Sequence, residues 1–87
     1  MARYKLTLDR RVRSKDLPGL PKTDAVRIAE RIGRLADDPR PRGAVKLTDQ
    51  PGYRVRQGNY RILYVIDDEA ATVRVLAVDH RRDAYRR

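Results

Sequence analysis

The spacing of apolar residues changes once along this chain, from a helical period before residue 43 to a strand period after it. Between residues 22 and 37, apolar side chains recur every three to four positions opposite charged ones, which predicts an amphipathic helix. Asp38 precedes a proline and is pushed out of helical geometry, so the helix should end there. After residue 43 the apolar residues alternate, which predicts strands at 44–47, 53–56, 60–66 and 72–78.

The first part of the chain adds a strand and a short helix to this plan. Residues 3–8 alternate and predict a strand, and Asp9 is placed to cap a helix at 10–17 that a Pro-Gly-Leu-Pro stretch ends. The expected order is β-α-α-β-β-β-β, followed by a short helix or irregular tail at 80–87. This is an α+β fold, in which an N-terminal helical hairpin packs on one face of a small, antiparallel-dominated twisted sheet.

Positive charge is concentrated in two segments. Residues 52–64 hold three arginines and no acid, and residues 80–87 hold four arginines and one aspartate, which together give +6 of the net charge of +9. The same segments hold four of the five tyrosines and the single histidine. Such a charge predicts a polyanionic partner, which is nucleic acid, an acidic lipid face or an acidic protein. The other interpretation is that the charge serves solubility alone. Cations interleaved with rings suit a surface that binds a phosphodiester.

Several kinds of site are missing from the sequence. With no cysteine and one histidine, a metal site is not expected, and the sequence has no Gly-rich phosphate loop or Ser-His-Asp set. We therefore expect no cofactor. The longest apolar runs span only a few residues, so we expect no membrane partner. The absence of cysteine and of an apolar secretion segment suits a cytoplasmic protein.

Three segments carry a family pattern across nearly the whole chain. They are the helix end 35–39 (Leu-Ala-Asp-Asp-Pro), the stretch from Lys46-Leu47 through 52–64 (Gly-Tyr-Arg-Val-Arg-Gln-Gly-Asn-Tyr-Arg-Ile-Leu-Tyr), and the ending 75–85 (Val-Leu-Ala-Val-Asp-His-Arg-Arg-Asp-Ala-Tyr). In this order and spacing they resemble the RelE/ParE toxin superfamily. The resemblance implies one RelE-like toxin domain over residues 1–87, with a microbial ribonuclease-like fold, acting as the toxin of a type II toxin–antitoxin system.

The two branches of this superfamily differ in target. RelE-type members cut messenger RNA in the ribosomal A site, whereas ParE-type members poison DNA gyrase. A tail with His-Arg-Arg followed by Tyr is more similar to the RelE branch. The resemblance thus implies a metal-independent, ribosome-dependent endoribonuclease that uses attack of the 2′-hydroxyl on the adjacent phosphate. The alternatives are a ParE-like gyrase poison, or an inactive homologue that acts only with its antitoxin.

Partners follow from the same resemblance. They are the ribosome and its mRNA, a cognate RelB-like antitoxin, and operator DNA reached only through the antitoxin complex. The charge of +9 predicts that the neutralising segment of the antitoxin is acidic and amphipathic, and that the association is sensitive to salt.

Three arginines are expected to form one basic patch. Arg54 and Arg56 project to one face by the two-residue period, and Arg61 begins the neighbouring strand across a tight hairpin. The resemblance implies that these three bind the phosphate and stabilise its developing charge. The other interpretation is a solvated strand face or the docking site of an acidic antitoxin. We also expect Lys46 and Arg82 to contact RNA phosphates.

The C-terminal residues supply the rest of the expected site. By resemblance, Arg81 lies near the leaving group and Tyr85 stacks on or orients the substrate. Some members have lysine where Arg54 and Arg56 stand, but an arginine effectively cannot lose its proton and so cannot serve as a general base. His80 is the remaining neutral-pH titrator and the predicted proton donor or acceptor.

Other residues near this site have plainer roles or open ones. Asp79 and Asp83 could hold His80 or pair with an arginine. If His80 is silent, ribosomal groups would transfer the protons. Tyr53, Tyr60 and Tyr64 are assigned to sheet packing.

Overall fold

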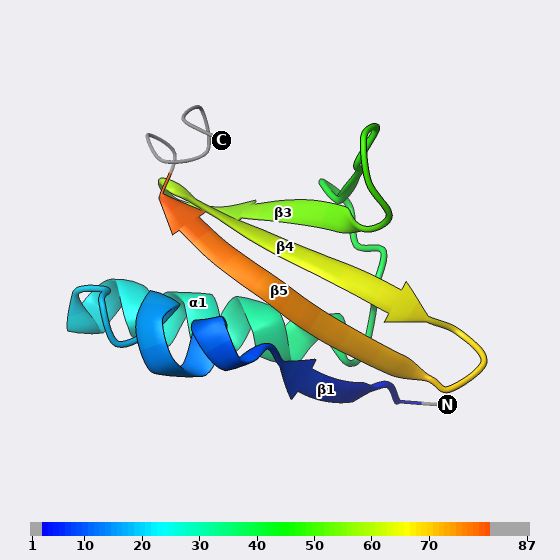
Figure 1. Ribbon diagram of the computed structural model, residues 1–87, viewed down its shortest axis with the longest axis horizontal. Coiled ribbons are helices and arrows are strands. Elements are labelled where there is room, and N and C mark those ends of the chain that lie inside the picture. Colours follow the sequence, from blue (N-terminus) through cyan, green and yellow to red (C-terminus); the bar gives the residue numbers. More distant parts are fainter. Residues whose placement is uncertain (1–2, 81–87) are drawn as a thin grey trace.

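The computed structural model describes residues 3–80, which build a five-stranded sheet with the order β1-β5-β4-β3-β2. Edge strand β1 runs parallel to β5, and the other neighbouring pairs are antiparallel. Helix α1 lies along one face of the sheet, with the short helix η1 on the same side (Figure 1). In chain order the elements are β1 (Lys5–Leu8), η1 (Val12–Asp16), α1 (Lys22–Leu35), β2 (Val45–Lys46), β3 (Tyr53–Gln57), β4 (Tyr60–Asp67) and β5 (Thr72–His80).

The core lies between α1, η1 and the sheet. The buried side chains of α1 fall on one stripe, and those of β3, β4 and β5 alternate with more exposed neighbours, as the two periods predict. Ala29, which the helical period would place on the apolar stripe, is exposed. Fully buried side chains are Val12, Ile28, Leu35, Val55, Ile62, Tyr64, Val73 and Val75.

The predicted helical hairpin is not confirmed, because α1 is the one main helix of residues 3–80. The segment predicted as the first helix forms the five-residue π-helix η1, in which the Leu17 amide donates to the Val12 carbonyl at 2.9 Å. No side-chain cap bond starts η1, and the Asp9 carboxylate instead lies 3.7 Å from Arg74. The wide turn brings Asp16 to the edge of β5, where its Oδ2 accepts the Val78 amide at 3.0 Å.

The last strand is longer than predicted and contains a β-bulge. It runs to His80, which the sequence had assigned to the tail, because pairing with β4 continues to Tyr60. Leu63 pairs with Ala77 but Tyr64 pairs with Val75, so one residue of β5 is extra. The bulge therefore exchanges the two faces of β5 beyond this point.

A polar network fixes the loop that follows α1. The Arg40 guanidinium donates to both carboxylate oxygens of Asp68 at 3.2 and 2.9 Å, and to the Tyr53 hydroxyl at 3.2 Å. The Tyr4 hydroxyl also donates to Asp68, at 2.6 Å. The residue before β1, the loop after α1 and the β4–β5 turn are thus held together. These bonds, from Arg40 first and Tyr4 second, lower the pKa of Asp68 from 3.8 to about 2.

Stability should therefore depend on the charge of Asp68. Because its pKa is lower in the folded chain, the contribution is present above about pH 4 and disappears as pH falls through about 2. We expect Asp68→Asn to lower the melting temperature modestly at pH 7, since the pair is exposed to solvent. Thermal denaturation of both proteins at pH 7 and pH 2 tests this. A difference that persists unchanged at pH 2 would contradict it.

Gly52 enters β3 in a conformation that favours glycine. Its φ is +121°, and a Cβ there would stand 2.6 Å from the Tyr64 carbonyl oxygen. We expect Gly52→Ala to destabilise the fold by about 1–3 kcal/mol, or on the order of 10 °C in melting temperature. Gly33→Ala is the matched control. That glycine lies in α1 with open space around it, so alanine should raise the melting temperature. Equal effects of the two changes would refute the strain argument.

Candidate functional site

The three arginines of the predicted patch share one face of the sheet. Val55 is buried on the α1 side, so its neighbours Arg54 and Arg56 lie on the other face. Arg56 stands directly opposite Arg61, and Arg61 stands directly opposite Asp79 of β5. Directly opposite residues share a face, with Cβ atoms about 5 Å apart. The structure thus brings Arg54, Arg56 and Arg61 together in a small area.

A cleft of about 400 Å³ opens on this face. Arg54, Arg61 and Asp79 line it from three strands, and the loop before β3 supplies an opposite wall. Arg54 and Arg61 are half-buried, whereas Arg56 is exposed beside them. Partial burial strengthens charge interactions relative to those on an open surface. The remaining lining residues are Leu47, Asp49, Gln50 and Leu63.

Asp79, which lines the cleft, forms an ion pair with Arg11. Asp79 is only 6% exposed, and its Oδ1 accepts a bond from Arg11 Nη2 at 3.3 Å. Arg11 also donates through Nε to Asp16 Oδ2 at 3.2 Å, so one guanidinium bridges two nearly buried carboxylates. The sequence left open whether Asp79 pairs with an arginine. It does, with an arginine 68 positions away that no local pattern singles out.

His80 lies on the other side of the sheet from the three arginines. Its register partner is Tyr60, whose ring it meets edge-on with centroids 5.2 Å apart. The Tyr60 hydroxyl donates to Asp24 of α1 at 3.1 Å, which places this pair on the helix side. Burial and that bond raise the pKa of Tyr60. A proton-transfer role for His80 stays a prediction.

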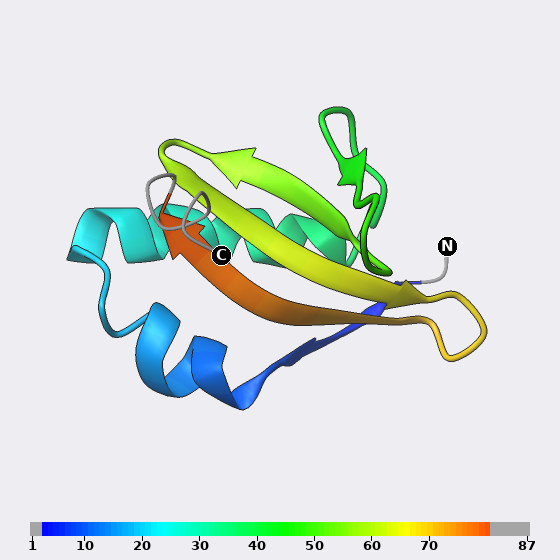
Figure 2. The ribbon, with the colours of Figure 1, turned by 45° about the horizontal axis from the view of Figure 1, so that its top comes forward.

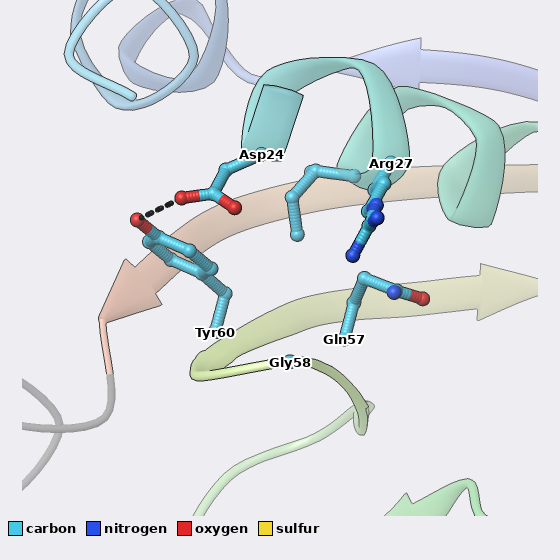
Figure 3. A pocket seen from close by; sticks show the side chains of 6 residues that line it. Asp24, Arg27, Gln57, Gly58 and Tyr60 are labelled. Atoms are coloured by element: carbon cyan, nitrogen blue, oxygen red, sulfur yellow. Dashed lines mark hydrogen bonds between the residues drawn. The ribbon is translucent and has the colours of Figure 1, made fainter. Parts of the chain in front are cut away.

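The β3–β4 hairpin is tied to α1 beside a small cavity of about 40 Å³ (Figure 3). Tyr60 reaches Asp24 on one side, and Gln57 lies near Arg27 on the other. Gly58 opens the two-residue turn with φ +60°, as a type II′ turn requires. This attachment holds in place the hairpin that carries Arg56 and Arg61. It also confirms Tyr60 as a packing residue. Tyr53 and Tyr64 are confirmed in the same role, because their rings stack on each other within the core and the Tyr64 hydroxyl is hydrogen-bonded to Pro39.

The remaining predicted site residues are either apart from the cleft or outside the described part of the chain. Lys46 is exposed and stands opposite Tyr53, whose side chain lies on the helix side of β3. Lys46 is therefore on the other face of the sheet from Arg54. Arg81, Arg82 and Tyr85 lie outside the described residues, as does Asp83. Within residues 3–80, no group of three or more His, Cys, Asp or Glu is placed to hold a metal ion. No helix in that same range is long and apolar enough to cross a membrane.

Comparisons with known proteins all match toxins of toxin–antitoxin systems, over most of the chain. Residues 6–85 match a protein family described as ParE toxin of type II toxin–antitoxin system, parDE. Toxin RelG of Mycobacterium tuberculosis is 41% identical over 75 residues, which cover 84% of this chain and 86% of RelG.

Solved structures give the same result. The toxin–antitoxin complex RelBE2 of Mycobacterium tuberculosis contains a chain with a TM-score of 0.81 and 36% identity, covering 93% of this chain and 94% of that one. The archaeal RelE–RelB complex from Pyrococcus horikoshii OT3 contains a chain with a TM-score of 0.74 and 26% identity, covering 93% and 97%.

Proposed function

Since this chain belongs to the RelE/ParE family of type II toxins, we propose that it is a ribosome-dependent endoribonuclease that cleaves mRNA in the A site. The observation that carries the proposal is the meeting of Arg54, Arg56 and Arg61 on one sheet face beside a polar cleft. A gyrase poison needs a binding surface, whereas RNA cleavage needs cations concentrated around one phosphate.

The chemistry needs a nucleophile, which the RNA itself supplies, together with cations at the phosphate and groups that transfer protons. The 2′-oxygen attacks the adjacent phosphorus, and the bond to the 5′-oxygen breaks, leaving a 2′,3′-cyclic phosphate and a 5′-hydroxyl. In this proposal Arg54, Arg56 and Arg61 bind the non-bridging oxygens and stabilise the charge that grows on them. Arg81 is proposed at the leaving oxygen, and Tyr85 is proposed to stack on a base. Proton transfer falls to His80 or to ribosomal groups.

A RelB-like antitoxin is the proposed protein partner. The matched structures from Mycobacterium tuberculosis and Pyrococcus horikoshii are complexes of a toxin with its antitoxin. The net charge of +9 favours an acidic segment in the partner, and operator DNA would be bound through that complex.

The test is a translation reaction reconstituted from purified components. Added protein should arrest it, and mapping of message 5′ ends should find new ends at codons that occupy the A site. The family that matches residues 6–85 is described as ParE toxin, so a gyrase poison is the second candidate function. A supercoiling assay with purified DNA gyrase separates the two. Inhibited gyrase with intact message would support the second candidate and reject the first.

A further inference from the structure

An acid occupies the arginine-lined cleft. Asp79 lines the cleft together with Arg54 and Arg61, and its side chain is 94% buried. Burying a carboxylate is unfavourable unless it is paired, and a negative charge weakens the attraction of the cleft for a phosphodiester. The ion pair with Arg11 offsets the cost of burying Asp79. Because the carboxylate adds no affinity for RNA, its place in the cleft calls for an effect on the neighbouring arginines.

The strand register arranges the charges in one row. Arg56, Arg61 and Asp79 stand side by side across β3, β4 and β5. Arg56 and Arg61 are like charges in directly opposite positions, which repel each other. Asp79 stands on the other flank of Arg61 and attracts it. The guanidinium of the central residue is therefore repelled from one side and attracted from the other.

The carboxylate of Asp79 is itself held from the sheet edge. Arg11 of the segment entering η1 donates to Asp79 Oδ1 at 3.3 Å and to Asp16 Oδ2 at 3.2 Å. Asp16 is fixed in turn by the Val78 amide at 3.0 Å, and its side chain is 7% exposed. This chain of bonds fixes the position of Asp79 relative to the backbone of β5.

We propose that Asp79 is a positioning residue for Arg61. It holds the Arg61 guanidinium over the cleft against repulsion by Arg56, and Arg11 orients Asp79 for that task. Asp79 acts through Arg61 and does not contact the substrate. The consequence for cleavage rests on the proposed function, whereas the ordering of Arg61 does not.

The first experiment measures that order directly and needs no cleavage. In ¹⁵N-labelled protein without RNA, the heteronuclear NOE of the Arg61 Nε–Hε group reports its fast motion. Asp79→Asn should lower this NOE clearly. Asp37→Asn is the matched control. It also removes a carboxylate that is paired with an arginine, Arg3, but the Asp37 side chain is 68% exposed. An Arg61 signal that is equally ordered in all three proteins would overturn the proposal.

A second variant covers the case in which Asp79→Asn does not fold. Arg11→Lys keeps a cation beside the two buried carboxylates, so the fold should survive, but one ammonium group lacks the planar geometry with which the guanidinium bridges them. The Arg61 NOE should fall in this variant too. An unchanged NOE in Arg11→Lys would again overturn the proposal.

The second experiment separates a positioning role from a structural or direct one. Asp79→Asn removes a negative charge, so it should tighten binding of a single-stranded RNA about two- to fivefold. The same change should slow cleavage by about tenfold or more, because the arginine is misplaced. Weaker binding together with slower cleavage would indicate a merely structural role.

The Arg61→Ala background gives the final distinction. If Asp79 acts through Arg61, Asp79→Asn should cost nothing further there. A further tenfold loss would mean that Asp79 takes part in the chemistry, which would overturn the proposal. If the unaltered protein binds RNA but never cleaves it, the proposed function fails, and the NOE and binding results still decide the role of Asp79.

Discussion

Arg61→Ala should slow cleavage of A-site message by about 10²- to 10³-fold, the usual cost of removing one preorganised donor at a developing negative charge. Arg61 stands between Arg56 and Asp79 and is half-buried in the cleft, so water replaces its guanidinium poorly. The fold should survive, because the core of β4 is built from Ile62 and Tyr64. The measurement is the single-turnover cleavage rate on stalled ribosomal complexes.

A matched arginine on the same sheet face serves as the control. Arg74 of β5 pairs with Val65, beyond the bulge from the cleft, and its exposed side chain lies near Asp9. Arg74→Ala should change cleavage by no more than a few fold. If Arg61→Ala and Arg74→Ala behave alike, general charge and not a defined phosphate site explains RNA binding.

Tyr64→Ala should cost about 3–5 kcal/mol, a large share of the 5–15 kcal/mol that stabilises a typical domain. The Tyr64 side chain is fully buried at the centre of the sheet and stacks on Tyr53 with centroids 6.0 Å apart. Its hydroxyl donates to the buried Pro39 carbonyl at 2.7 Å and so fixes the loop after α1 to the sheet. Urea denaturation should show a much lower midpoint, or a protein that is largely unfolded in buffer.

Tyr64→Phe isolates the hydroxyl. It leaves the Pro39 carbonyl without its donor and should cost about 1–3 kcal/mol. Tyr53→Phe is the matched control, because its hydroxyl meets Arg40 in an exposed bond, and we expect a loss below about 0.5 kcal/mol. Equal losses for the two phenylalanine variants would contradict the role assigned to the buried bond.

The change of hydrophobic period predicts much of the fold. It locates α1, the four C-terminal strands and the β3–β4 hairpin to within a few residues, because burial on one face imposes each period on the sequence. Period two within β3, and the short hairpin to β4, also place Arg54, Arg56 and Arg61 on one face. These are local consequences of chain geometry.

The bulge and the π-helix could not be predicted in this way. Alternation counted from Arg74 would put His80 on the arginine face and Asp79 on the core face. The extra residue in β5 reverses both placements. The conformation of η1 depends on Asp16 meeting Val78, a contact between residues 62 positions apart. Tertiary contacts of this kind leave no periodic signal in the sequence, and for the same reason Arg11 was missed.

Mapping of RNA contacts by NMR tests the central claim most directly. Amide shifts are followed while a short single-stranded RNA, blocked against cleavage by 2′-deoxy substitution, is added at low salt. The largest changes should fall on residues 54–63 and 77–79, with the exposed side of α1 unaffected. Changes confined to residues 22–35 of α1, with Arg54, Arg56 and Arg61 unperturbed, would contradict the claim that this sheet face holds the phosphodiester.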